Sequence, residues 1–404
     1  MILSDVFSSR GMENGRGKMT LDSDIACPKG GFVSPIDHVD TNIDSCVEIN
    51  GEKRKLIIHF DLRNTILVSD SVTNVSMEQA LNSFLTGVVW GKVKSDSSWQ
   101  WHSYTPSLTP PAENTTTFYK YLERKLVKTP KDRTMLRIAT GDFAHSDIGK
   151  GFLPVFESHI EKMKWQYSEV PDSGKLTMCG SDGKHYHYIL PSVYKAIHQL
   201  HNEGREFAIV LRTYGLDTQN VITSLGFGLS GNHPGFPKDL GLPINQNVGK
   251  VKRSDNQVIV FETYSDHSTT KYTNDRDIYH LLSKSQGISG FMDDFRYWQD
   301  NGYMFSTAKP LYIDPFDSKV QHIIFDDNFR KYENDSIIDI RVFEEAGCRN
   351  AKSISRPEVE KYENMCVVQA DLMTAIDDHD YFIKSIHNCE ENYTNFLKKF
   401  HSKV

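Results

Sequence analysis

Residues 56–60 read LIIHF, and an aspartate, Asp61, follows directly. A strand with one face in water would carry polar residues at alternate positions, so this largely apolar run predicts a strand that is covered on both faces. Such strands are typical of parallel sheets, where ligands bind beyond the carboxyl ends of the strands. Asp61 is therefore expected either to end the strand as an ordinary turn or cap residue, or to lie in a ligand site.

Three further apolar runs predict strands of the same sheet, at 207–211, 322–325 and 366–370. The segment before the first of these has apolar residues at helical spacing and a helix-ending glycine, Gly204. Helical stretches also follow the runs at 207–211 and 366–370. Strands alternating with helices indicate the α/β class, with a mostly parallel, doubly wound sheet.

The organisation of the chain follows from where these strands lie. Residues 1–50 are polar, show no sustained period and are expected to form a flexible N-terminal arm. Residues 51–70 and 191–404 are expected to form the α/β core. The stretch 71–190 is expected to be an inserted subdomain, and about 226–300 a smaller insert outside the sheet.

The first insert is rich in tryptophan and contains the run WQWHSYTPSLTPP at 99–111. These rings would form either a stacking surface for a base or sugar, or the small core of the insert itself. The run FMDDFRYWQDNGY at 291–303 mixes acids with aromatic residues. It is expected to form an amphipathic helix that packs under a lid.

The composition and net charge of the chain argue against several classes of protein. The 404 residues carry a formal net charge of −7, which argues against a general nucleic-acid binder. No apolar run approaches the roughly 20 residues that span a bilayer, and no secretory signal opens the chain. The six cysteines are scattered, without a C-x-x-C pair, and are expected to be reduced. A cytoplasmic protein without nucleic-acid or membrane partners is expected, and the sequence does not indicate its oligomeric state.

The residues that follow the predicted strands form a chemical set. Asp61 and Thr65 follow the first strand, Thr213 follows the second, and Asp326 and Asp327 follow the third. Lys309 lies 17 residues before that acidic pair. Each residue alone has an ordinary explanation as a cap, a turn or a surface charge. Together they supply the nucleophile, hydroxyl, cation and metal ligands that phosphoryl transfer to an aspartate with Mg²⁺ requires.

This set resembles the haloacid dehalogenase-like superfamily. The resemblance rests on IIHFDLRNT, AIVLRT, the region of Lys309, and IIFDD. It covers about 56–68, 193–225 and 305–330, and leaves out the arm and both inserts. It implies a Rossmann-like three-layer sandwich with a parallel sheet and an inserted cap subdomain.

The resemblance also implies the catalytic roles. Asp61 would attack phosphorus, Thr213 and the backbone after Asp61 would hold the phosphoryl oxygens, and Lys309 would stabilise the charge that they share. Because the spacing to the lysine varies in this superfamily, Lys284 competes with Lys309 for that role.

A magnesium site and a substrate site are implied as well. Asp61, Asp326 and Asp327 would bind Mg²⁺, directly or through water, and the backbone carbonyl of Arg63 would be a further ligand. The side chains expected to contact a small phosphorylated substrate are Arg63, Asn64 and Arg212.

Arg63 departs from the pattern, because phosphatases of this superfamily commonly have a second aspartate there that protonates the leaving oxygen. A guanidinium stays cationic and has no lone pair to accept a proton. Either the leaving group needs little protonation, or another group supplies the acid, or the protein binds without turnover. The first hypothesis is a Mg²⁺-dependent phosphohydrolase that acts through an aspartyl-phosphate. The alternative is a catalytically weak relative that binds a phosphorylated ligand or a protein partner, with Arg63 as an added anchor. Arg63 could also be an ordinary salt-bridging residue.

Overall fold

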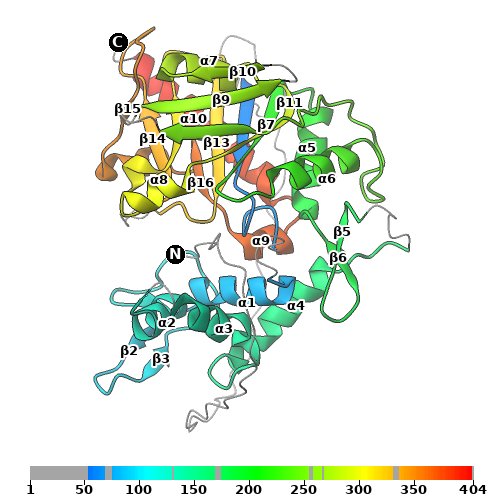
Figure 1. Cartoon of the computed structure of the whole chain (residues 1–404), viewed down its shortest axis with the longest axis vertical. Helices are drawn as coiled ribbons and strands as arrows, with labels where there is room; N and C mark the ends of the chain where they lie inside the picture. The colour runs from blue at the N-terminus through cyan, green and yellow to red at the C-terminus, as the bar shows by residue number, and fades with distance from the viewer. Residues whose placement is uncertain are drawn as a thin grey trace.

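The structure is a computed structural model and describes residues 53–68, 75–129, 132–168, 174–253, 258–265, 268–330 and 336–402. The expected N-terminal arm, 1–50, lies outside the described residues. The described chain is a mixed α/β protein built around a large, mostly parallel sheet, with helices packed against it (Figure 1).

The main sheet has eight strands within the described ranges, in the order β10-β9-β8-β11-β7-β1-β13-β16. Neighbouring strands run parallel from β8 to β16, whereas β9 and β10 are antiparallel to their neighbours. The strands are β1 (Lys55–Phe60), β7 (Phe207–Thr213), β8 (Gly249–Arg253), β9 (Ile259–Ser265), β10 (Ser268–Tyr272), β11 (Gly287–Met292), β13 (Val320–Asp326) and β16 (Val367–Gln369).

The apolar runs of the sequence correspond to the centre of this sheet. The runs at 56–60, 207–211, 322–325 and 366–370 lie in β1, β7, β13 and β16, so the predicted mostly parallel α/β fold is confirmed. The expectation that about 226–300 lies outside the sheet is wrong, because β8 to β11 come from this stretch. Every residue of β10 is exposed or half-buried, so that strand has no apolar run by which to recognise it.

Strand β1 lies at the centre because both of its faces are apolar. Leu56, Ile58 and Phe60 belong to the large hydrophobic cluster on one face, whereas Ile57 belongs to a second cluster on the other. All four side chains are at most 1% exposed. Because side chains alternate along a strand, the burial of both faces, including His59, whose Nε2 lies 3.1 Å from His322 Nδ1, places β1 between two covering layers.

Helices pack on the main sheet and its edge. Helix α5 begins at a proline in its first turn and ends just before Gly204, which has a φ of +65°, so the predicted helix stop at Gly204 is confirmed. Within the described residues, none of the helices combines the length and apolar character needed to cross a membrane. The helices after the insert are α5 (Pro191–Asn202), α6 (Thr218–Leu229), α7 (Asp275–Ser283), α8 (Phe295–Asp300), α9 (Leu372–Asp377) and α10 (Tyr381–His401); short 3-10 helices are η4 (Phe305–Thr307) and η5 (Arg356–Lys361).

The elements of residues 75–190 form no part of the main sheet in the described structure. Helices α1 to α4 lie together on one side of the sheet, and α9 lies between these helices and the sheet (Figure 1). The elements are α1 (Met77–Val88), β2 (Trp90–Val93), β3 (Trp99–Trp101), β4 (Thr116–Thr117), α2 (Phe118–Leu126), α3 (Arg133–Gly141), η2 (Phe143–His145), η3 (Lys150–Phe152), α4 (Leu153–Met163), β5 (Thr177–Cys179) and β6 (His185–His187).

Trp99 and Trp101 pack in an aromatic cluster inside this insert. Trp101 packs against the rings of Trp99, Phe118 and Phe152 with centroids 4.7 to 5.3 Å apart. Aromatic pairs at these separations add to the stability that burial gives. Of the two readings of the tryptophan-rich run, the structure therefore supports the core of the insert.

A small sheet of β12 (Lys309–Ile313), β14 (Ile338–Val342) and β15 (Lys352–Ser353) packs beside the main sheet. Strand β12 pairs in parallel with β14, and all five of its residues are buried. Its first residue is Lys309, so this sheet determines where that lysine lies.

We predict that Gly287→Ala destabilises the protein far more than Gly302→Ala. Both glycines have positive φ, +58° and +67°, but a Cβ atom at Gly287 would lie 1.9 Å from the carbonyl oxygen of Pro243, whereas Gly302 faces open space. Gly302→Ala should cost about 1 kcal/mol from backbone strain, and Gly287→Ala about 3 kcal/mol or more. Urea unfolding measures both, and equal losses would contradict the packing of β11 against Pro243.

Candidate functional site

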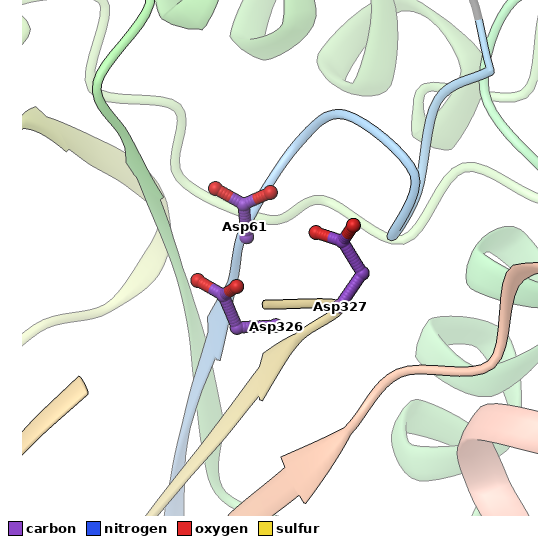
Figure 2. A group of neighbouring side chains, drawn as sticks. All are labelled: Asp61, Asp326 and Asp327. Atoms are coloured by element: carbon purple, nitrogen blue, oxygen red, sulfur yellow. The ribbon is translucent and has the colours of Figure 1, made fainter. Parts of the chain in front are cut away.

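Two neighbouring strands bring the acidic residues together. Strands β1 and β13 are parallel and in register, with Phe60 opposite Phe325, so Asp61 and Asp326 lie at the same edge of the sheet. Carboxylate oxygens of Asp61, Asp326 and Asp327 lie within 4.8 Å of one another. Figure 2 shows the three side chains grouped at the ends of the two strands. The structure thus confirms that these residues, far apart in sequence, converge.

Lys309 lies between two of these acids. Its Nζ donates to Asp61 Oδ1 at 2.6 Å, to Asp326 Oδ2 at 2.8 Å and to the backbone oxygen of Arg212 at 3.3 Å. The side chain is 1% exposed. Lys284, the competing lysine, is exposed at the C-terminal end of α7. The structure therefore selects Lys309 as the lysine of the site.

Burial and mutual repulsion raise the pKa values of Asp61 and Asp327. Burial raises the pKa of Asp61 to about 7; Lys309 opposes this shift and Asp326 adds to it. Burial, and then the charges of Asp326 and Asp61, raise the pKa of Asp327 well above its ordinary value. Burial alone would lower the pKa of Lys309, but the two aspartates raise it. Lys309 bonds to Asp61 and Asp326, and the charge of Arg330 acts on Asp327, so full ionisation of the three carboxylates would leave an excess of negative charge.

This donor set suits a hard divalent cation. Mg²⁺ and Ca²⁺ prefer oxygen ligands, and carboxylates are their usual charged ligands in proteins. Asp61, Asp326 and Asp327 offer such oxygens close together, and a cation would offset the excess negative charge. The same oxygens also suit Mn²⁺, so the site by itself indicates a class of cation.

The loop after Asp61 folds back as a tight turn. The backbone N–H groups of Ile66 and Leu67 both donate to Leu62 at 2.9 Å, and Asn64 has a φ of +58°. Asparagine tolerates this left-handed conformation better than most residues, which explains its presence here. Thr65 Oγ1 accepts from the backbone N–H of Asp327 at 3.3 Å and so ties the turn to the acidic pair. Substrate binding by Asn64 stays a prediction.

Thr213 lies at the end of β7, the other neighbour of β1. Phe60 pairs with Leu211, which places Thr213 beside the start of the Asp61 loop. Its Oγ1 accepts from the backbone N–H of Gly215 at 3.0 Å, and the side chain is 6% exposed. The structure thus brings the predicted hydroxyl to the same sheet edge as Asp61.

Arg63 points toward the loop that follows β7. Its Nη2 lies 3.2 Å from Asp217 Oδ2, and the two side chains are 15% and 4% exposed. A Cβ atom added to Gly215 would lie 3.8 Å from the same Nη2. Arg63 is therefore held in an ion pair next to Thr213 and Gly215, at the edge of the site.

Arg212 does not lie where a substrate could reach it, and its predicted role in substrate binding is wrong. Its side chain is fully buried. The guanidinium makes a two-pronged contact with Asp293, at 2.9 and 2.6 Å, and donates to the backbone oxygen of Pro310 at 3.2 Å. Because side chains alternate along a strand, Arg212 and Thr213 face opposite sides of the sheet. Arg212 is thus a structural residue.

Sequence reasoning missed Asp293 and Asp217. Asp293 follows β11, and its backbone N–H donates to the oxygen of Thr213 at 2.7 Å. The run 291–303 was expected to be one amphipathic helix, but its first two residues end β11 and α8 begins only at Phe295. A signal was present, because the acidic pair after GISGFM repeats the pattern of IIFDD. Asp217 had no comparable signal.

A cavity of about 460 Å³ lies between the insert and α9. Its lining residue Asp371 directly follows Ala370, whose backbone N–H donates to the oxygen of Asp326 at 3.2 Å, but Asp61, Asp326 and Asp327 do not line the cavity. The cavity combines apolar walls with a few polar groups, as small-molecule sites do. Its lining residues are Val88, Thr105, Pro106, Ser107, Leu108, Pro154, Val155, Ser158, His159, Asp371, Met373, Thr374 and Asp377.

We predict that Arg212→Met lowers the free energy of unfolding by about 3–5 kcal/mol, because it leaves the Asp293 carboxylate buried without its partner. The double variant Arg212→Met/Asp293→Leu should regain most of this loss, since both buried charges are then gone. Urea unfolding at neutral pH measures each variant. A stable Arg212→Met with weakened ligand binding would instead restore the role in substrate binding.

In comparisons with known proteins, no family model, no curated protein and no solved structure matches this chain. The function of the chain is therefore inferred from the residues of the site.

Proposed function

We propose that this protein is a Mg²⁺-dependent phosphohydrolase of the haloacid dehalogenase-like type, acting through an aspartyl-phosphate at Asp61 on a small phosphorylated substrate. One observation carries the proposal. Lys309 bridges Asp61 and Asp326, with Asp327 alongside, at the carboxyl edge of a mostly parallel sheet. A nucleophilic carboxylate, a fixed cation and metal ligands at such an edge are what aspartyl phosphorylation needs.

The proposed hydrolysis proceeds in two steps, phosphoryl transfer to Asp61 and attack by water. An oxygen of Asp61 attacks phosphorus, a new O–P bond forms, and the bond to the leaving oxygen breaks with its electron pair on that oxygen. Water then attacks the phosphorus of the aspartyl-phosphate. The bond to Asp61 breaks, its electron pair returns to the carboxylate, and both protons of the water remain on the released phosphate.

Residues of the chain hold the reacting groups. Lys309 contacts Oδ1 of Asp61 and would offset the charge that gathers between the carboxylate and the phosphoryl group. The hydroxyl of Thr213 and the backbone N–H groups after Asp61 would donate to the phosphoryl oxygens. Mg²⁺ bound by Asp61, Asp326, Asp327 and the backbone oxygen of Arg63 would supply further neutralisation of that charge.

The insert is the proposed cap subdomain of the three-layer fold. It meets the core across the cavity beside α9, and its α4 contacts α9 through Lys162, whose Nζ lies 2.8 Å from Asp377. A substrate held in this cavity would contact both the insert and α9. Closure of such a cap would exclude water and select the substrate.

The second candidate function is phosphate binding without turnover. Arg63 favours it, because this cation lies beside the site, held by Asp217, where an acid would aid catalysis. In that case the site would retain an anionic ligand through Arg63, Lys309 and Thr213 and release it unchanged.

We predict that Asp61→Asn abolishes hydrolysis of phosphomonoesters and phosphoanhydrides in the presence of Mg²⁺. The loss should be at least about 1,000-fold, because the nucleophile is gone. The matched control is Asp300→Asn, an aspartate of α8 with a side chain 65% exposed, which should keep full activity. Acid quenching during turnover, followed by peptide mapping, should locate a phosphoryl group on Asp61 in the wild type.

Two results would contradict this proposal. Turnover that survives in Asp61→Asn would exclude the aspartyl-phosphate. No turnover in the wild type, combined with calorimetric binding of inorganic phosphate that Lys309→Met abolishes, would favour the second candidate function.

We predict that Mg²⁺ stabilises the protein more at pH 8 than at pH 6. Because the pKa of Asp61 is raised to about 7, its contribution to stability is present at low pH and lost as the pH rises through 7 in the metal-free protein. Mg²⁺ needs the ionised carboxylates, so its apparent affinity should fall about tenfold per pH unit below 7 for each displaced proton.

Thermal unfolding with MgCl₂, against NaCl of equal ionic strength at each pH, measures this effect. Asp327→Asn should reduce the Mg²⁺-dependent shift in Tm at both pH values, since it removes one ligand. A shift in Tm that does not depend on pH, or on Asp327, would show that the cation binds elsewhere.

A further inference from the structure

Tyr214 directly follows Thr213 and places an aromatic ring beside the lysine of the site. The Nζ of Lys309 lies over the face of this ring, 5.1 Å from its centroid. A cation within about 6 Å of a ring face is attracted by the ring, and the attraction is stronger where water is excluded. Lys309 is 1% exposed, so its ammonium and the ring of Tyr214 form a desolvated cation–π contact.

This contact is additional to the hydrogen bonds of the ammonium group. A lysine side chain has three N–H donors. The Nζ of Lys309 donates to three oxygens, those of the Asp61 and Asp326 side chains and of the Arg212 backbone. The ring of Tyr214 therefore takes none of these donors and attracts the positive charge through its face.

Helix α8 holds the ring of Tyr214 in its orientation. Trp298 stacks with this ring, with centroids 5.3 Å apart and an interplanar angle of 14°, and Phe295 meets it edge-on at 5.6 Å. Trp298 is 1% exposed and belongs to a hydrophobic core cluster, against which Tyr214 packs. The aromatic residues of the run 291–303 thus fix the ring that contacts Lys309.

The hydroxyl of Tyr214 takes no part in this arrangement. Its oxygen is buried and has no hydrogen-bond partner among the residues that the structure describes. A buried hydroxyl without a partner costs stability, because it loses its hydrogen bonds to water. The aromatic face, rather than the hydroxyl, is therefore the part of Tyr214 that serves the site.

We infer that Tyr214 is a positioning residue, whose ring keeps the ammonium of Lys309 beside Asp61 while a phosphoryl group binds there. This inference rests on the proposed phosphohydrolase. When a phosphoryl oxygen approaches Lys309, one N–H group has to turn from an oxygen of the protein to that oxygen. The attraction of the ring does not depend on where the N–H groups point, so the ammonium keeps its place during this exchange.

The test separates the ring from the hydroxyl and from general packing, in the full chain with Mg²⁺. Tyr214→Phe keeps the ring, whereas Tyr214→Leu removes it. The control is Phe396→Leu, which removes a ring at another half-buried position of the same cluster, where it packs against Tyr393. Thermal unfolding verifies that each variant is folded, and Tyr214→Phe should be at least as stable as the wild type.

The expected losses are selective. With p-nitrophenyl phosphate as the probe, Tyr214→Leu should lower kcat about tenfold, as the loss of a desolvated cation–π contact predicts. KM should change less than about threefold, because Lys309 mainly offsets charge that gathers as the phosphoryl group is transferred. Tyr214→Phe and Phe396→Leu should stay within about twofold of the wild-type kcat, since both keep a ring over Lys309.

The outcomes distinguish this inference from the proposed function. A wild-type kcat in Tyr214→Leu overturns the role of Tyr214 while hydrolysis through Asp61 stands. A loss as large in Tyr214→Phe or in Phe396→Leu overturns it as well, since the hydroxyl or general packing would then be responsible.

A wild type without turnover overturns the proposed phosphohydrolase, and calorimetric binding of orthovanadate then decides the role of Tyr214. Tyr214→Leu should weaken this binding about tenfold, and Tyr214→Phe should leave it unchanged. Equal binding by both variants overturns the role of Tyr214. A wild type that neither turns over p-nitrophenyl phosphate nor binds orthovanadate overturns both proposals.

Discussion

A single buried ammonium group, the Nζ of Lys309, holds the functional edge of this protein together. It contacts the acids at the ends of β1 and β13, and without it three carboxylates within 4.8 Å would repel one another in a poorly solvated site. An isolated lysine would not be stable there, because burial disfavours its charge. The small sheet of β12, β14 and β15 delivers Lys309 to this place, so a peripheral part of the fold serves the centre of the site.

Neighbouring residues of β7 face opposite sides of the sheet and have different roles. Arg212 turns to one face and joins β7 to the residue after β11 through Asp293, whereas Thr213, its neighbour, lies with the acidic site. The backbone oxygen of Arg212 also accepts from Lys309. One strand end thus contributes a buried ion pair, a hydroxyl and a backbone acceptor. Each takes its role from the alternation of side chains rather than from residue type alone.

The sequence predicts the parts of this arrangement that burial dictates. Runs covered on both faces are apolar throughout, which makes β1 and β13 visible and places their acids at one edge. Strand β8 alternates charged with apolar residues and β10 is exposed or half-buried, so neither has an apolar run, whereas β9 begins with the short apolar run IVF and was overlooked. The ion pair of Arg212 with Asp293 could not be predicted for another reason. The two residues are 81 positions apart in the sequence, and only the folded sheet brings them together. Without this contact an arginine after a strand resembles a ligand-binding residue.

The net charge of the acidic site indicates the order in which a cation and a phosphorylated substrate would bind. When ionised, Asp61, Asp326 and Asp327 carry three negative charges, against one positive charge on Lys309 and one on Arg330, whose charge acts on Asp327; the net charge of −1 repels a phosphoryl dianion. Arg63 does not change this sum, because Asp217 offsets it. A divalent cation would change this net charge to +1, so the site would then attract the phosphoryl group rather than repel it. On the proposed function, the cation therefore binds before the phosphorylated substrate, and the raised pKa of Asp61 reflects the metal-free site.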